Sequence, residues 1–261
     1  MLRTRIFTAV ISLLIFLAVI FVMPPLFLKI LITFIILVGA WEWSEFLTYS
    51  SKSLRLSFAA VIFSSILIIE YILSDYTIFI LQVACIWWLI AFIWLFFFPT
   101  SISNAFRMIC GALVLLPLYL ALIELYKAST EMLLFALVIV WAADMGAYFV
   151  GKQYGRIKLA PKISPKKTWE GVFGGFILVS LIAFTWSYYA DLNLMVSLPF
   201  CFAIGVLSVV GDLTVSMFKR NSGLKDSGNF FPGHGGVLDR IDSISAAAPF
   251  FFLGITEIGL L

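Results

Sequence analysis

Long apolar runs, separated by short polar or proline-containing segments, dominate the pattern of this chain. Each run is close to the about 20 apolar residues that a helix needs to cross the hydrocarbon layer of a membrane. The pattern therefore predicts an all-α polytopic membrane protein with about nine transmembrane helices and two polar cytoplasmic connections. The predicted spans are residues 6–23, 26–47, 54–73, 76–98, 105–126, 130–150, 171–190, 194–216 and 243–260.

Composition supports a single integral membrane domain. Charged residues make up 12% of the chain, about half of the share of about 25% in soluble domains, so no separate soluble domain is expected. The first run is 18 residues long and Pro24-Pro25 follows it, which favours a retained helix over a cleaved signal peptide. Cys85, Cys110 and Cys201 lie far apart in apolar runs, which argues against a disulfide framework or a zinc site.

The basic residues divide unevenly between the two sides of the predicted membrane. With a cytoplasmic N-terminus and alternating spans, 15 of the 17 lysines and arginines fall on the cytoplasmic side, and only Lys29 and Lys127 fall outside. This agrees with the positive-inside rule. We therefore expect a protein of the bacterial cytoplasmic (inner) membrane whose two polar connections face the cytoplasm, and we do not expect nucleic acid as a partner.

The first polar connection, Gly151 to Gly171, carries lysines and hydroxyls just before a predicted helix. Anchoring on anionic lipid headgroups explains part of its charge. Residues 164–168, Ser-Pro-Lys-Lys-Thr, are interpreted as a proline-rigidified turn that presents two ammonium groups between two hydroxyls. Such groups near a helix N-terminus bind phosphate well. The predicted phosphate-binding residues here are Ser164, Lys166, Lys167 and Thr168.

The second connection, Ser216 to Asp242, gathers three acids, four basic residues and the only histidine. Its glycines, including Gly233, Gly235 and Gly236, allow positive φ and let backbone N–H groups approach a phosphate closely. The spacing fits neither a Walker A loop nor a dinucleotide fingerprint. We predict that this loop also binds phosphate.

Two acids follow this glycine loop, Asp239 and Asp242. They share a face if a helix begins there, and such a pair suits a divalent cation that carries phosphates. Taken alone, the pair is better explained as a helix cap with a surface Asp/Arg contact. Beside the glycines and the basic residues, we favour the metal.

The lone histidine, His234, lies in the glycine loop. No serine stands in a Gly-x-Ser-x-Gly motif and no cysteine lies in a polar setting, so a catalytic triad is unsupported. His234 could bind phosphate, transfer a proton or brace the turn. We favour phosphate binding or turn support.

Two further acids, Asp144 and Asp212, lie inside or at the cytoplasmic end of predicted spans. A charge there costs at least about 2.5 kcal/mol, so such residues usually face a polar cavity or a metal. The alternative is a buried polar contact that only fixes helix packing. The remaining acids are expected to be solvated because they lie near span ends or in loops: Glu42, Glu45, Glu70, Asp75, Glu124, Glu131, Asp191 and Glu257.

These motifs resemble the signature of the phosphatidate cytidylyltransferases, the CDP-diacylglycerol synthases. The segment from Ser216 to Asp242 follows the family pattern, Ser-x-apolar-Lys-Arg-x4-Lys-Asp through Pro-x-His-Gly-Gly to Asp-Arg-apolar-Asp, without a break. The segments around Asp144 and from Ser164 to Gly171 are similar to the family's second cluster. Met145 departs from the pattern, since the family often has Thr there, and methionine offers no hydroxyl at this position.

The resemblance implies transfer of the cytidylyl group from CTP to phosphatidate, which yields CDP-diacylglycerol and diphosphate. It implies Mg2+ as a cofactor, K+ as a second cation and a homodimer. The family's metal ligands correspond to Asp212 and Asp239, with Asp242 adjacent to them. Residues 1–128 are then expected to form a scaffold, dimer or lipid-facing part, and residues 129–261 the catalytic part.

The chemistry of the residues agrees with this reaction. A lipid phosphate is already anionic, so it needs no general base, and the obstacle is its repulsion by a triphosphate. Phosphoryl transfer depends mainly on positioning and charge stabilisation. The expected cations are Lys166, Lys167, Lys219, Arg220, Lys225 and Arg240. Asp144 and Asp226 are expected to orient lysines or a second cation.

Other classes of protein remain alternatives. A CTP-dependent kinase of a membrane isoprenoid alcohol would need the same nucleotide, but its alcohol would require a base. A CDP-alcohol phosphotransferase is disfavoured because its Asp-Gly-x2-Ala-Arg motif is missing. An ion or lipid transporter is disfavoured because neither an internal repeat nor a polar cluster on the outer side is visible.

Overall fold

The computed structural model describes residues 2–47, 51–228, 230 and 235–258, with the side chains of residues 2–9 and 12 excepted. Each of the nine predicted spans corresponds to one helix within these ranges. The helices are α1 (Leu2–Phe21), α2 (Pro25–Trp43), α3 (Lys52–Tyr71), α4 (Thr77–Leu95), α5 (Asn104–Ala128), α6 (Thr130–Tyr154), α7 (Trp169–Tyr189), α8 (Leu194–Asn221) and α9 (Leu238–Glu257). Two short 3-10 helices, η1 (Ser44–Phe46) and η2 (Ser74–Tyr76), follow α2 and precede α4.

Seven of these helices are long and apolar enough to cross a membrane, namely α2 to α8, two of them counted together with an adjoining 3-10 turn. This confirms the predicted all-α polytopic class. The helices α6 and α8 continue beyond the predicted apolar runs, to Tyr154 and Asn221. Helix α9 begins at Leu238, earlier than predicted. Apolar runs mark the part of a helix that lies in hydrocarbon, so they do not report the polar turns beyond it.

The first polar connection differs from the sequence prediction. Residues 164–168 are not a turn: they form strand β2 (Ser164–Thr168), which pairs antiparallel with β1 (Lys158–Ala160). The true turn lies between the two strands, at residues 161–163. Thr168 then caps α7, because its Oγ1 accepts a hydrogen bond of 3.2 Å from the Gly171 backbone N–H. The hairpin thus ends at a helix N-terminus, as the phosphate-site prediction requires.

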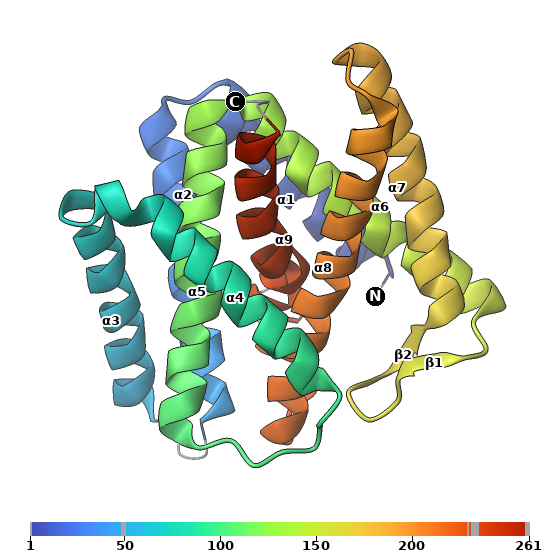
Figure 1. Cartoon of the computed structure of the whole chain (residues 1–261). Coiled ribbons are helices and arrows are strands. Elements are labelled where there is room, and N and C mark those ends of the chain that lie inside the picture. Colours follow the sequence, from blue (N-terminus) through green and yellow to red (C-terminus); the bar gives the residue numbers. More distant parts are fainter. Residues whose placement is uncertain (1, 48–50, 229, 231–234, 259–261) are drawn as a thin grey trace.

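Helix α9 lies at the centre of the fold, where it packs against α4, α5 and α8 (Figure 1). Helices α6 and α7 pack closely on each other and lie to one side, and the hairpin joins their ends (Figure 1). The closest approaches use glycine. At Gly146 on α6, an added Cβ would overlap the backbone carbonyl oxygen of Gly174 on α7. This contact brings Asp144 and the start of α7 toward the same end of the molecule.

Helices α8 and α9 also meet at a glycine, Gly211, next to Asp212. A Cβ at Gly211 would overlap the backbone carbonyl oxygen of Asp242, so Gly211→Ala should push α8 away from α9. We expect this variant to be destabilised by about 1–3 kcal/mol and to lose activity, measured by thermal unfolding and turnover of purified protein. Gly205→Ala is the matched control on α8, since its nearest neighbouring atom would be at 3.7 Å. Equal behaviour of the two variants would contradict this account.

Candidate active site

Four elements bring their polar side chains together where α8 passes α9. On α8, Asp212, Ser216 and Lys219 are spaced by four and three residues, so they share one face of the helix. The Ser216 hydroxyl donates a hydrogen bond of 3.0 Å to Asp212 Oδ1. Both the predicted metal ligand on this helix and the first lysine of the signature therefore point to the same side.

Lys167 reaches this face from strand β2. Its Nζ lies 2.6 Å from Asp212 Oδ2, and both side chains are about a quarter exposed, 24% and 25%. The pair is thus partly exposed rather than sealed in the core. Burial lowers the pKa of Lys167, but the charge of Asp212 and its hydrogen bond outweigh burial and leave this pKa raised. Lys167 is therefore a full positive charge at neutral pH.

A second ion pair lies about two turns further along α8, at Lys219. Lys219 Nζ is 2.6 Å from Asp239 Oδ1, and these side chains are only 8% and 12% exposed. The other carboxylate oxygen of Asp239 accepts hydrogen bonds of 3.0 Å from the backbone N–H groups of Ser227 and Gly236. Asp239 thus ties the two ends of the glycine loop to α8.

Asp242 and Asp144 complete the cluster. Asp242 is buried and accepts a hydrogen bond of 2.9 Å from the Ser243 backbone N–H. It interacts electrostatically with Asp212, Lys219 and Lys167. Asp144 interacts electrostatically with Lys167 and Asp212. The structure therefore brings together six residues that the sequence analysis selected, namely Asp144, Lys167, Asp212, Lys219, Asp239 and Asp242.

One residue of this site was missed by sequence reasoning. Glu42, expected to be solvated, is only 3% exposed. Its carboxylate accepts hydrogen bonds from the backbone N–H groups of Val237 (3.0 Å) and Leu238 (2.8 Å) and from the Ser227 hydroxyl (3.2 Å). The prediction was wrong because Glu42 ends an apolar span, and only the fold shows that the start of α9 meets it there.

Glu42 and Asp239 together hold what we call the loop neck, the residues Ser227 and Gly236 where the glycine loop begins and ends. Each carboxylate contacts Ser227, and Gly236 is bonded to Asp239 while a Cβ on it would overlap Glu42. Beside the neck, Gly235 has φ +82°, a conformation that favours glycine. The prediction of positive φ in this loop is confirmed at Gly235.

The other predicted residues take several positions. The Arg220 guanidinium donates to the backbone carbonyls of Ile163 and Leu224, each at 3.1 Å, so it ties the hairpin to the end of α8. Ser164 is half-buried in β2. The exposed predicted residues are Lys166, Lys225, Asp226 and Arg240. Gly233 and His234 lie outside the described residues.

Two carboxylates of this cluster, those of Asp212 and Asp239, form ion pairs with lysines. Within the described part of the chain, no three histidine, cysteine or acidic side chains stand together as a ready-made metal site. Asp212 and Asp239 each hold an ammonium group, which can exchange its carboxylate for the phosphate of an incoming anion. The arrangement can therefore bind phosphates with its lysines and release oxygen ligands for a hard cation at the same time.

Comparison with known proteins identifies the family. The model of the cytidylyltransferase family matches residues 3–256. The chain belongs to this family. This cytidylyltransferase is 38% identical over 260 residues to the phosphatidate cytidylyltransferase of Pseudomonas aeruginosa, a match that covers 96% of each chain. It is 33% identical over 282 residues to the phosphatidate cytidylyltransferase of Haemophilus influenzae, covering 96% of this chain and 97% of the relative. The family assignment confirms the resemblance drawn from the motifs.

Proposed function

We propose that this cytidylyltransferase transfers the cytidylyl group of CTP to phosphatidate, giving CDP-diacylglycerol and diphosphate in phospholipid biosynthesis. The observation that carries the proposal is the pair of lysine–aspartate contacts, Lys167–Asp212 and Lys219–Asp239, at the mouth of a glycine loop in a membrane-spanning fold. Relatives of nearly the same length that bear this name support it.

The reaction needs little proton chemistry. A phosphate oxygen of phosphatidate attacks the α-phosphorus of CTP, and the bond from that phosphorus to the bridging oxygen breaks, so diphosphate leaves with the electron pair. The lipid phosphate is anionic at neutral pH and requires no base. The repulsion between two anions is the main barrier, and positioned cations lower it. Lys167 and Lys219 are placed to do so, with Lys166, Lys225 and Arg240 near the mouth.

The residues present suit Mg2+, because the donor set consists of carboxylate oxygens, which this hard ion prefers. Asp212 and Asp239 would hold it, with Asp242 beside them, and K+ is proposed as a second cation. When bound, Mg2+ would neutralise charge on the CTP phosphates and on the leaving diphosphate. Lys167 and Lys219 would then turn from the two carboxylates to the phosphates, and Asp144 would keep Lys167 oriented.

We also propose the membrane in which the enzyme lies and the side that its active site faces. The uneven division of lysines and arginines supports a cytoplasmic active site in the bacterial inner membrane. CTP would enter from water, and phosphatidate would enter sideways from the bilayer, so the helices serve as an anchor and as a lipid port. We further propose a homodimer, as the family resemblance implies.

Purified protein with labelled CTP and phosphatidate tests the function. We expect magnesium-dependent release of diphosphate and formation of CDP-diacylglycerol. If an isoprenoid alcohol were the acceptor instead, the nucleotide product would be CDP and phosphatidate would be inert. Supplying both acceptors to the same preparation, with a chelator control, separates the two reactions by their products.

Replacement of His234 tests proton transfer. Because the lipid phosphate needs no base, His234→Ala should retain more activity than Asp212→Asn, which removes the negative charge that pairs with Lys167. The measurement is kcat with CTP and phosphatidate for both variants at one protein concentration. The opposite order would assign proton transfer to His234.

A further inference from the structure

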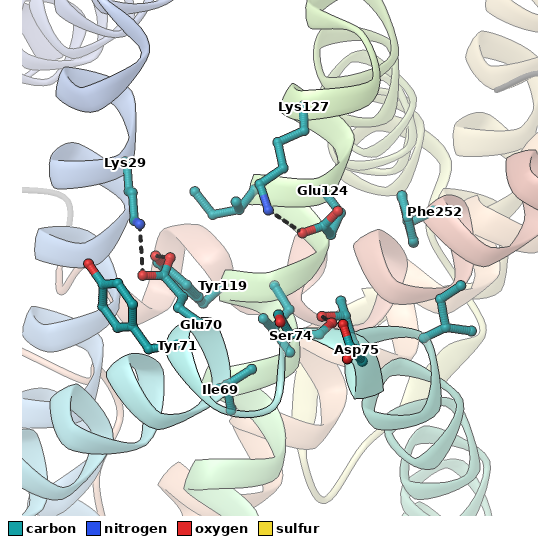
Figure 2. A pocket seen from close by; sticks show the side chains of 14 residues that line it. Lys29, Ile69, Glu70, Tyr71, Ser74, Asp75, Tyr119, Glu124, Lys127 and Phe252 are labelled. Carbon is teal, nitrogen blue, oxygen red and sulfur yellow. Dashed lines mark hydrogen bonds and ion pairs between the residues drawn. The ribbon is translucent and has the colours of Figure 1, made fainter.

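A polar pocket, seen from close by in Figure 2, lies near the start of α2. It is a cavity of about 470 Å3 between the start of α2, the α3–α4 connection and the end of α5. This volume is within the range of small-molecule sites, about 300–1,000 Å3. Polar side chains line much of it, including Lys29, Glu70, Tyr71, Ser74, Asp75, Thr77, Tyr119, Glu124 and Lys127. We call it the distal pocket.

The distal pocket lies opposite the catalytic cluster. Helix α2 carries Lys29 near its start and Glu42 near its end, and α9 carries Asp239 at its start and the lining residue Phe252 near its end. Thirteen residues of helix separate the members of each pair, about 20 Å at 1.5 Å per residue. The sequence analysis found no polar cluster on the outer side, and this expectation was wrong: its only two outer lysines, Lys29 and Lys127, both line this pocket.

Two ion pairs hold charged side chains in place inside the pocket. Lys29 Nζ lies 2.7 Å from Glu70 Oε2, and the Glu70 side chain is only 14% exposed. Tyr119 is almost fully buried and donates its hydroxyl to Glu70 Oε1 at 2.5 Å. Lys127 Nζ lies 2.7 Å from Glu124 Oε1 (Figure 2). Glu70 was also expected to be solvated, and its burial between Lys29 and Tyr119 corrects that expectation.

The charges of the pocket do not cancel. Three carboxylates and two ammonium groups line it, and Asp75 has no ion-pair partner among the described residues. Asp75 is exposed in η2, just before α4, and the Lys127 side chain is 64% exposed. A ligand can therefore meet both an uncompensated carboxylate and a reachable ammonium group. This favours a zwitterion over a simple anion.

The apolar wall and the position of the pocket point to a lipid. Ile69, Ile78, Leu120, Ile123 and Phe252 form the apolar part of the lining. On the flanks, Tyr71 is 77% exposed and Tyr76 is 58% exposed, and exposed tyrosines at span ends mark the headgroup level of a bilayer. A pocket with charges inside, an apolar wall and a position at that level suits a molecule with a zwitterionic head and acyl chains.

We propose that the distal pocket binds the phosphoethanolamine headgroup of a membrane phospholipid. The primary ammonium donates to Asp75 and Glu124, and the phosphate accepts from Lys127. A primary ammonium has three N–H donors for these carboxylates, whereas a choline headgroup has none. A glycerol headgroup brings a net negative charge to a pocket with excess carboxylate. The pocket therefore selects phospholipids with an ethanolamine headgroup over those with a choline or glycerol headgroup. The inference does not depend on the reaction at the catalytic cluster.

Native mass spectrometry of the purified full chain tests the proposal. The probes are phospholipids with identical acyl chains and ethanolamine, choline or glycerol headgroups, together with soluble glycerophosphoethanolamine as a competitor. We expect preferential retention of the ethanolamine lipid, weakened about three- to tenfold by Asp75→Asn and by Lys127→Gln, the loss for one charge-assisted contact at a partly exposed site. Asp191→Asn, which alters an exposed acid between α7 and α8, is the matched control and should change nothing.

Both test positions are exposed, so the variants should fold, and elution volume with helical circular dichroism verifies this. Equal retention of ethanolamine and choline lipids would overturn the proposal, as would unchanged retention by both folded variants. If the soluble headgroup competes as well as the lipid, the pocket takes a free metabolite and the membrane source is wrong. Loss of ethanolamine selectivity in Asp75→Asn alone would still support the ammonium contact.

Discussion

Asp239→Asn is expected to reduce cytidylyl transfer about 10³-fold, the scale on which removal of one preorganised electrostatic group acts. The asparagine keeps the size of the side chain but loses the charge that pairs with Lys219 at 2.6 Å. It also replaces one of the two oxygens by an N–H donor, although the loop neck needs an acceptor for the N–H groups of Ser227 and Gly236. The variant therefore loses both the charge that balances Lys219 and the acceptor that positions the loop neck. The measurement is CDP-diacylglycerol formation by purified enzyme.

The controls separate catalysis from folding. Asp191→Asn makes the same chemical change at an exposed position outside the site and should leave turnover unchanged. Membrane insertion of Asp239→Asn should be normal, because the nine helices do not depend on this charge. Near-normal turnover by the variant would contradict the assignment of Asp239 as a metal ligand and as the anchor of the loop.

Glu42→Gln is expected to lower kcat/KM for CTP about 10- to 100-fold. Two backbone N–H groups, those of Val237 and Leu238, donate to the two oxygens of this buried carboxylate. Glutamine offers one acceptor and turns an N–H donor toward the other group. A buried unpaired donor costs about 1–3 kcal/mol, and this cost falls on the loop neck that must close around phosphates. The measurement is steady-state kinetics with varied CTP at saturating lipid.

Glu45→Gln is the matched control for this variant. Glu45 lies three residues away and pairs with Arg55 rather than with the loop. Its replacement should leave the kinetics with CTP near normal. If Glu42→Gln altered only thermal stability and left KM and kcat for CTP unchanged, the carboxylate would be a packing element alone and not a positioning residue.

The helices and the chemical groups of the site could be predicted from the sequence, because lipid imposes a length on each span and penalises every charge inside it. Asp144 and Asp212 were selected on that penalty, and both lie in the cluster. Asp239 and Asp242 were placed on one helix by their spacing, and α9 does begin just before them.

The remaining features depend on tertiary contacts that no local pattern carries. Lys167 was selected as a phosphate ligand, but its pairing with Asp212 joins a strand to a helix that begins 27 residues later. The signature predicted Arg220 as a cation for phosphate, whereas it binds two backbone carbonyls that the hairpin turn and the α8 end provide. Glu42 and Glu70 looked like ordinary span-end acids, because their partners lie on other helices.

The loop neck also sets when during biosynthesis the enzyme can become active. Glu42 and Val237 are separated by 195 positions, so the carboxylate that holds the loop neck leaves the ribosome long before the residues that it binds. Until α9 is inserted, Lys219 on α8 lacks its partner Asp239, and the glycine loop lacks the Asp239 contacts that join its two ends. A partly inserted chain therefore has no assembled catalytic site, and CTP turnover begins only when the last helix has entered the membrane.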